Sequence, residues 1–290
     1  MDIIYTLQAN SWLFYTAIVF FGLSVGSFLN VVAYRLPIIL NREWKQQCHE
    51  YLETDPPEPD PEIKDLSLSS PRSTCPNCGH MITVIENIPV VSYLLLRGRC
   101  ASCKNRISFQ YPLVELFTAA ASVAVAYRFG ISIQTVAALF FTWALIALTL
   151  IDIHKQLLPD IITLPLMWLG LLLAIFEVFT NIQSSVIGAM AGYLILWSVF
   201  QGFLIITGKE GMGHGDFKLL AALGAWFGWE LLPQIILLSS VVGTILGLGM
   251  LLTGKTEAQS KIPFGPYLAL AGWIALIWGD QLNHLYYSIL

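Results

Sequence analysis

Long apolar runs dominate this chain, and polar residues gather in the stretches between them. The runs are about 18 to 25 residues long, enough to cross a bilayer at a helical rise of about 1.5 Å per residue. They predict an all-α polytopic membrane protein. About eight transmembrane helices are expected, and the sixth, which is short, is expected to be tilted or only partly inserted. The predicted spans are residues 12–35, 112–129, 131–151, 161–180, 184–207, 217–230, 233–253 and 264–284.

Composition agrees with this pattern. Of the 290 residues, 56% are hydrophobic and only 12% are charged, and the mean hydropathy is +0.68. A soluble domain carries roughly twice that charged fraction. The net charge of −4 and the lack of a basic patch give no reason to expect nucleic-acid binding. No Lys or Arg precedes the first apolar run and no small-residue cleavage site follows it, so a retained helix is expected rather than a signal peptide.

The basic residues predict the topology. If the eight spans alternate in direction, all fifteen Lys and Arg residues except Arg128 fall on one side. An excess of Lys and Arg marks cytoplasmic loops, so both termini are expected outside and the long connection after the first helix in the cytoplasm. Three parts follow: a first transmembrane helix at 1–36, a cytoplasmic segment at 37–110 and a second membrane domain at 111–290. Within the cytoplasmic segment, residues 53–65 are acidic and Pro-rich, which is typical of an extended linker.

Four of the five cysteines form two close pairs in the cytoplasmic segment. The pairs are Cys75-Pro-Asn-Cys78 and Cys100-Ala-Ser-Cys103, with 21 residues between them. Two such turns can present four thiolates to one tetrahedral Zn²⁺, with a spacing near that of zinc ribbons. Four cysteine ligands leave no open coordination position, so the zinc is expected to be structural. The alternatives are two disulfides or four free thiols, and a cytoplasmic location argues against disulfides.

Two aspartates stand where a membrane protein tolerates them least. Asp152 ends one apolar run, and Asp216 begins another within Gly211-Met-Gly-His-Gly-Asp-Phe-Lys218. A carboxylate at this depth is retained only with a partner, water or a function. The predicted topology places both at the same cytoplasmic depth. Two carboxylates on neighbouring helices can share one proton and activate water against an amide, which is the chemistry of aspartic proteases.

Other acids border the predicted membrane spans, and each alone is more often interfacial or capping. Asp160 follows a proline and is expected to N-cap the fourth helix. Glu115 lies one turn inside the second helix, where a structural hydrogen bond is expected. Glu230 and Asp280 are predicted to be solvated at outer helix ends.

The glycines before Asp216 are the other notable feature of that stretch. Gly213 and Gly215 allow a close approach of backbone, including that of a substrate. The series is not read as a phosphate-binding loop, because it lacks a preceding strand and the Gly-Lys spacing. For His214, an interfacial polar residue is the first interpretation and tuning of the site is the alternative.

An ordered set of motifs links the chain to a known family. The chain resembles the type IV prepilin peptidases, the bifunctional leader peptidases and N-methyltransferases of pilus and type II secretion systems. The likeness covers nearly the whole chain, and the Gly-x-Gly-Asp element alone is shared with presenilin-like intramembrane proteases. The matching motifs are Gly26-Ser-Phe-Leu-Asn-Val-Val32, Tyr34-Arg-Leu-Pro37, both Cys pairs, Tyr111-Pro-Leu-Val-Glu115, Ile151-Asp152, Leu158-Pro-Asp160, Gly213-His-Gly-Asp-Phe-Lys218 and Pro263-Phe-Gly-Pro266.

The resemblance implies a function and a set of site residues. Asp152 and Asp216 match the catalytic aspartates of the family. The implied activity is cleavage of a short basic leader from type IV prepilins and pseudopilins, on the cytoplasmic side of the bacterial inner membrane. The new N-terminal residue would then be methylated with S-adenosylmethionine. The candidate supporting residues are Gly213, Gly215, Lys218, Glu115 and Asp160.

The methyl-donor site is not identified by any motif. No Gly-rich strand-to-helix turn of the Rossmann kind is present. By elimination, the segment between Arg35 and Gln110 is expected to carry much of the transferase function.

Two other classes of protein could carry the same residues, namely proton-coupled transporters and noncatalytic membrane scaffolds. Paired intramembrane acids also serve as proton relays in transporters, but the sequence lacks the two similar halves common in such proteins. A noncatalytic membrane scaffold with a zinc-binding module would leave the paired aspartates unexplained. Loss of a prepilin leader, with or without methylation, distinguishes these readings.

Overall fold

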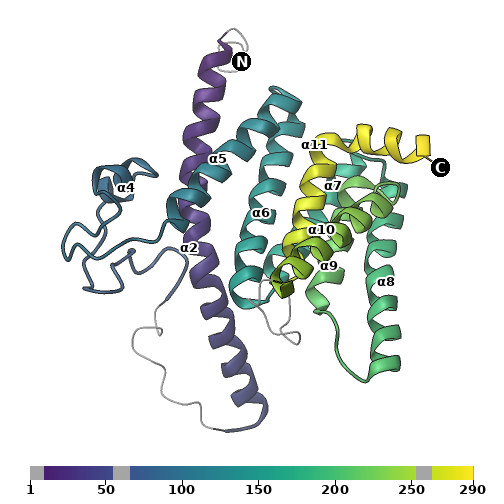
Figure 1. The fold of residues 1–290 in the computed structure, drawn as a ribbon, viewed down its shortest axis with the longest axis horizontal. Helices are drawn as coiled ribbons and strands as arrows, with labels where there is room; N and C mark the ends of the chain where they lie inside the picture. Colours follow the sequence, from purple (N-terminus) through teal and green to yellow (C-terminus); the bar gives the residue numbers. More distant parts are fainter. Residues whose placement is uncertain (1–9, 55–65, 253–262, 290) are drawn as a thin grey trace. The chain divides into compact units, whose positions relative to one another are not determined.

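The computed structural model describes residues 10–54, 66–252 and 263–289, and over these residues the fold is helical (Figure 1). Apart from two isolated β-bridges, the described residues contain no strand pairing. The chain divides into two compact units, Met1–Ile131 and Ser132–Leu290. The helices are α2 (Ser11–Tyr51), η1 (Ile85–Asn87), α4 (Val91–Leu95), α5 (Gln110–Phe129), α6 (Ile133–Lys155), α7 (Asp160–Ile175), α8 (Ile182–Thr207), α9 (His214–Phe227), α10 (Leu232–Leu252) and α11 (Gly265–Ile289).

The all-α prediction is confirmed, and each of the eight predicted spans overlaps a different α-helix. Over the described residues, five of these, namely α2, α5, α6, α8 and α10, are long and apolar enough to cross a membrane by length and composition. Helix α7 is shorter, and its end at Ile175 comes before the predicted end at residue 180. The acidic linker predicted at 53–65 lies largely outside the described residues.

In the first unit, α2 and α5 pack closely along small residues. Gly22 and Gly26, four positions apart on α2, face α5, where a Cβ at Gly26 would come within 2.7 Å of the Glu115 Cα. Such spacing of small residues lets membrane helices approach closely. With 41 residues, α2 is about 60 Å long, twice the thickness of a hydrocarbon core. It therefore continues well past the predicted membrane span 12–35, through Pro37 to Tyr51.

The cysteine-bearing segment, residues 66–109, is joined by hydrogen bonds to α2 at one point and to α5 at another. The buried guanidinium of Arg35 donates to the carbonyl oxygens of Ser67 and Pro71 at 2.9 and 2.8 Å. Further along, the Val90 amide donates to Oε2 of Glu115 at 2.7 Å. Val90 has a φ of 60°, a positive value that is unusual for a β-branched residue. The structural hydrogen bond expected of Glu115 is confirmed.

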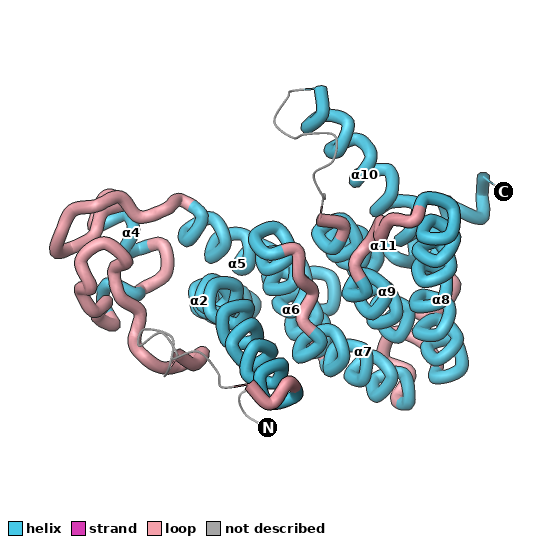
Figure 2. Tube along the Cα trace, turned by 90° about the horizontal axis from the view of Figure 1, so that it is seen from below, coloured by secondary structure: helices cyan, strands magenta, loops and turns pink. Residues whose placement is uncertain are grey.

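In the second unit, α9 is the central helix. Figure 2 shows it among α7, α8 and α11, and it packs against all three. Its residues from Asp216 to Phe227 are buried except for Lys218. Its 14 residues reach only about 21 Å, too short to span a bilayer. A helix that is apolar on all sides belongs in a protein core, so its neighbours shield it from lipid.

Close contacts fix α9 against α7 and α8. Gly188 of α8 meets Gly224 of α9 backbone to backbone, and a Cβ on either would collide with the other helix. On the opposite side, the Trp226 indole donates to the Leu166 carbonyl of α7 at 2.8 Å. The position of α9 decides where Asp216 lies, since Asp216 is in its first turn.

Two features differ from the sequence-based expectations for this unit. Glu230 was expected to be solvated, but it is only partly exposed and accepts a hydrogen bond from the Ser184 hydroxyl of α8. Helix α11 kinks at Trp278, where the backbone is non-helical, and continues to Ile289.

Candidate active site and metal centre

Asp152 lies in the last turn of α6. That helix starts at an N-cap, where Ser132 Oγ accepts a hydrogen bond from the Thr135 amide, and it stops at Gln156, which adopts the left-handed conformation. The Asp152 side chain is buried, and its Oδ2 accepts a 3.0 Å hydrogen bond from the backbone amide of Gly265. Gly265 is the first residue of α11, so this bond joins the end of α6 to the beginning of α11.

Asp216 lies in the first turn of α9, directly after the glycine series. Gly213 is the N-cap residue, and the Asp216 amide donates to its carbonyl at 3.2 Å. Unpaired amides at a helix N-terminus favour negative charge, which suits a carboxylate here. Oδ1 of Asp216 is buried and accepts no hydrogen bond from the described residues. A buried acceptor of this kind calls for a partner such as water, a proton or a substrate group.

The two aspartates converge around Leu158. Gly215, one residue before Asp216, lies so close that a Cβ there would approach the Leu158 Cβ to 2.7 Å. A Cβ at Gly265 would approach Leu158 Cδ2 to 3.0 Å and Asp152 Oδ2 to 2.6 Å. The two carboxyl groups are near enough for their charges to interact. The structure therefore brings together the pair of acids that the sequence singled out.

Gly213 leaves the approach to Asp216 open. Among the described residues, a Cβ built on Gly213 would meet only one atom within 4 Å, Oδ2 of Asp216, at 3.6 Å. Gly213 is itself exposed. An extended peptide backbone could therefore reach the Asp216 carboxyl group over this residue.

Asp160 and Lys218 form an ion pair beside the aspartates. Lys218 Nζ lies 2.7 and 2.6 Å from the two carboxylate oxygens of Asp160. Asp160 was expected to N-cap the fourth helix, but Pro159 occupies that position and Asp160 is the first helical residue. Its carboxylate points to Lys218 of α9, so the interaction links two helices instead of closing the end of one.

His214 packs against aromatic rings. Its ring centroid lies 5.2 Å from that of Phe200 on α8 and 5.4 Å from that of Phe217 on α9. The His214 side chain is exposed on its other side. These contacts agree with the interpretation of His214 as an interfacial polar residue. They also connect the glycine series to α8.

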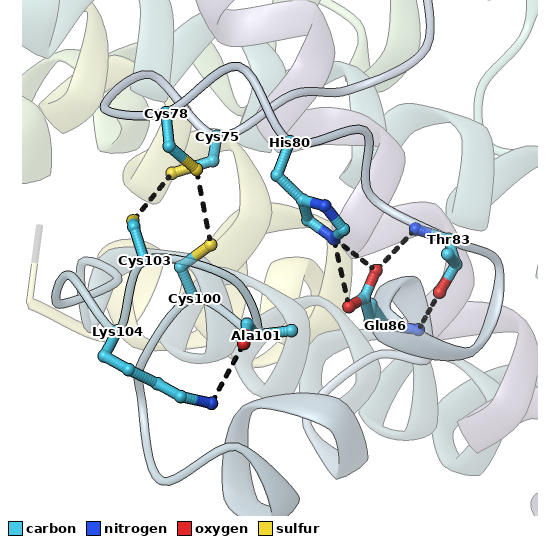
Figure 3. Close-up of polar contacts among 9 residues, drawn as sticks. All are labelled: Cys75, Cys78, His80, Thr83, Glu86, Cys100, Ala101, Cys103 and Lys104. Atoms are coloured by element: carbon cyan, nitrogen blue, oxygen red, sulfur yellow. Dashed lines mark hydrogen bonds and ion pairs between the residues drawn. The ribbon is translucent and has the colours of Figure 1, made fainter.

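The four paired cysteines gather at one point, as the spacing predicts (Figure 3). All four Sγ atoms lie within 4.8 Å of one another. Cys75 and Cys103 are 3.8 Å apart, and Cys78 and Cys100 are 4.0 Å apart. Tetrahedral zinc with Zn–S bonds of about 2.3 Å requires S–S distances of about 3.8 Å. A disulfide needs about 2.05 Å, so the arrangement fits a metal and not two disulfides.

The two cysteine turns share one local design. Each is closed by a β-bridge, Thr74 to Met81 in one and Arg99 to Arg106 in the other. Each has a left-handed residue four positions after its first cysteine, namely Gly79 and Lys104. In the first turn the Cys75 amide donates to the His80 carbonyl at 2.9 Å, and in the second turn the Cys100 amide donates to the Asn105 carbonyl at 2.8 Å.

Backbone amides favour the thiolate form of two cysteines. The amide of Asn105 is the main cause that lowers the pKa of Cys103 to about 6. The amide of Asn77 in the same way lowers the pKa of Cys75. Because metals bind thiolates and not thiols, these amides favour metal binding at neutral pH.

One polar pair beside the cysteines was missed from the sequence. His80 Nε2 lies 3.3 Å from both carboxylate oxygens of Glu86 (Figure 3). Glu86 Oε2 also accepts from the Thr83 amide at 2.7 Å, while the Glu86 amide donates to Thr83 Oγ1 at 3.3 Å. The hydrogen bond from the Thr83 amide is the main cause that lowers the pKa of Glu86. The Thr-x-x-Glu spacing of a capping box was the available signal.

Known proteins match both units. The model of the bacterial peptidase A24 N-terminal domain covers residues 20–129, and the model of the type IV leader peptidase family covers residues 139–248. The chain also matches full-length relatives, each named prepilin leader peptidase/N-methyltransferase. The Aeromonas salmonicida protein is 53% identical over 96% of this chain and 95% of its own length. The Aeromonas hydrophila protein is 54% identical over 95% and 94%, and the Pseudomonas aeruginosa protein 52% over 99% and 98%.

No solved structure matches the chain. The family models span 20–129 and 139–248, and so include the four cysteines, Asp152 and Asp216. On this evidence the chain belongs to the type IV leader peptidase family.

Proposed function

We propose that this protein is a membrane aspartic endopeptidase that removes the leader from type IV prepilins and pseudopilins and then N-methylates the new N-terminal residue. The observation that carries the peptidase half is the convergence of Asp152 and Asp216 around Leu158. The transferase half rests on family membership and on relatives about half identical in sequence that carry both activities in their name.

Asp152 and Asp216 would work as a pair that shares one proton. Two carboxyl groups at short range do not both ionise readily, so a proton is retained between them. The protonated acid polarises the scissile carbonyl, and the other accepts a proton from water as the water attacks. Because the two carboxyl groups titrate together, the shared proton belongs to the pair and not to either residue alone. Collapse of the tetrahedral intermediate returns a proton to the leaving amine.

The surroundings of the pair suit a peptide substrate. The Gly265 amide holds one oxygen of Asp152, which fixes the direction of that carboxyl group. The described residues leave space beside Gly213 for an extended chain to approach Asp216. The hydrophobic helix of a prepilin would enter from the bilayer, while its basic leader stays on the cytoplasmic side of the inner membrane.

The cysteine cluster would hold a structural zinc ion. Cys75, Cys78, Cys100 and Cys103 supply four thiolates with tetrahedral spacing, which leaves no position for a substrate or water. Such an ion would supply folding energy to a segment with little regular structure. For methyl transfer, S-adenosylmethionine would supply the methyl group, and this chain would have to align the substrate amine with it.

One experiment tests the whole proposal. The purified protein in detergent is incubated with a prepilin and S-adenosylmethionine, and the substrate mass is followed. Loss of the leader together with gain of one methyl group supports both activities. Loss of the leader alone supports only the peptidase half. An unchanged mass, with substrate and donor both shown to bind, contradicts the proposal.

A further inference from the structure

The short helix α4 is held at the level of the membrane surface. Val90, the residue just before it, donates its amide hydrogen to Glu115 on α5. Helix α5 is a candidate membrane span that begins at Gln110, so Glu115 is about 7 Å along the helix from its first residue. Figures 1 and 2 both place α4 beside the beginning of α5. The start of α4 therefore lies level with the second turn of a membrane helix.

The side chains around α4 are apolar and are left uncovered by the described residues of their unit. Leu94 and Leu95 are 68% and 76% exposed, and Val91 is 48% exposed. The preceding turn adds Val84 and Ile85, at 75% and 74%. A contiguous exposed group of large apolar residues marks an interaction surface.

Basic residues follow this apolar surface along the chain. Between Glu86 and Glu115 the chain contains no Asp or Glu. It contains four basic residues there, all exposed: Arg97, Arg99, Lys104 and Arg106. Long basic side chains reach from an apolar surface to lipid phosphates, and clusters of them next to a membrane helix bind anionic headgroups.

We propose that the cysteine-bearing segment docks onto the anionic membrane surface. The apolar side chains of Val91, Leu94 and Leu95 enter the boundary between headgroups and acyl chains, and the four basic residues contact lipid phosphates. The depth set by Glu115 and the charge of the segment favour a lipid surface over a protein partner. This docking goes beyond the proposed function and does not rest on it, because it concerns lipid and not substrate.

A depth measurement on the full chain in nanodiscs tests this proposal. A nitroxide is attached to a Leu94→Cys variant in a Cys48→Ser background, with the four clustered cysteines protected by bound metal. Accessibility to oxygen, which partitions into lipid, is compared with accessibility to a water-soluble nickel complex. Labels at Lys45→Cys, on the α2 end beyond the bilayer, and at Phe20→Cys, inside the α2 span, serve as the aqueous and lipid references.

The expected result is a Leu94 label about 5–10 Å below the headgroup level, which is the usual depth of an interfacial helix. A label as accessible to nickel as the Lys45 reference would overturn the proposal. A label shielded from both reagents would also overturn it, because protein would then cover the surface. A second label at Leu95→Cys should give the same answer, which guards against local distortion by one substitution.

The charge of the lipid headgroups provides a second, independent test of the docking. In nanodiscs of phosphatidylglycerol the label should sit deeper than in nanodiscs of phosphatidylcholine. The Arg97→Gln/Arg106→Gln variant should lose that difference while keeping the apolar contact. If the double variant kept the full response to phosphatidylglycerol, the assigned charge contact would be wrong.

Discussion

The backbone amide of Gly265 donates a 3.0 Å hydrogen bond to Oδ2 of Asp152, whereas Oδ1 of Asp216 accepts none from the described residues. The two carboxyl groups are thus in unlike surroundings. One is oriented by a helix-starting amide, and the other has a free acceptor beside an open glycine. Such asymmetry suits a pair in which one acid is fixed and the other meets water or substrate.

We expect Asp152→Asn and Asp216→Asn each to abolish leader cleavage. Asparagine keeps the size and most hydrogen bonding of aspartate, but it cannot take or give a proton. Loss of a general acid or base lowers rates by about 10²–10⁴-fold. The measurement is the rate of leader removal from a prepilin by purified enzyme.

Asp280→Asn is the matched control, because Asp280 is an exposed acid on α11. It should cleave at the normal rate. If either Asn variant of the pair retained near-normal cleavage, a catalytic role for that aspartate would be excluded.

Gly265→Ala should lower cleavage with little effect on membrane insertion. The new Cβ would lie 2.6 Å from Asp152 Oδ2, so the carboxylate has to move. A displacement of about 1 Å at a reacting group can cost about 10²-fold in rate. The control is Gly202→Ala on α8, where no atom of the described residues lies within 4 Å of the added Cβ. Equal activity of the two variants would show that the position of Asp152 tolerates this shift.

The sequence was sufficient for features set by local spacing. Apolar run lengths predicted the helices, and two Cys-x-x-Cys turns predicted a four-thiolate cluster because each turn fixes its own pair. The meeting of Asp152 and Asp216 was also expected, from their shared depth. For the helices and the cysteine cluster a short-range sequence pattern determines the structure. For the two aspartates the membrane fixes the depth of both residues.

Features that depend on packing between distant residues were not predicted. Nothing near Asp160 in the sequence indicates Lys218, 58 residues away, and the proline before it suggested a cap instead. Nothing near Glu230 in the sequence indicates its hydrogen bond to Ser184, because Glu230 lies in the turn between α9 and α10 and Ser184 lies 46 residues earlier, on α8. The continuation of α2 through Pro37 to Tyr51 was not predicted, because apolar run length indicates only the membrane span.

The Asp160–Lys218 ion pair should support the site without performing chemistry. Both side chains are partly exposed, at 52% and 30%, and exposed ion pairs contribute about 0–1 kcal/mol. Asp160→Asn should therefore slow cleavage far less than Asp152→Asn. The measurement compares the two rates and adds the exchanged double variant Asp160→Lys/Lys218→Asp. Recovery of activity on exchange supports a purely electrostatic link, whereas a loss as large as that of Asp152→Asn would place Asp160 in the reaction.

The cysteine cluster should bind about one zinc ion per chain, as expected for a four-thiolate structural site. Cys100→Ser should lose most of the metal and unfold the segment, because metal binding energy in such a site is folding energy. Cys48→Ser is the control, since Cys48 is exposed and lies outside the cluster. Metal analysis of purified protein checks this. Absence of zinc together with disulfides detected by mass spectrometry would contradict it.

The two activities should be separable. Hydrolysis needs two carboxylates and water, whereas methyl transfer needs a donor aligned with an unprotonated amine. That amine exists only after the leader is removed, so methylation follows cleavage in order but does not need the aspartates chemically. Asp216→Asn should therefore methylate a prepilin that already lacks its leader, measured as transfer of labelled methyl from S-adenosylmethionine.

Conversely, substitutions between Gly26 and Arg35 or in the cysteine-bearing segment should spare cleavage and reduce methylation. Arg35 is the most direct test, because its guanidinium ties Ser67 and Pro71 to α2. Arg35→Gln keeps a donor but loses the paired contact, and it should disturb the cysteine-bearing segment more than the second unit, where Asp152 and Asp216 lie.

The outcome that would contradict separate sites comes from the aspartate variants. If both variants bound the pre-cleaved substrate yet transferred no methyl, the two reactions would share one site.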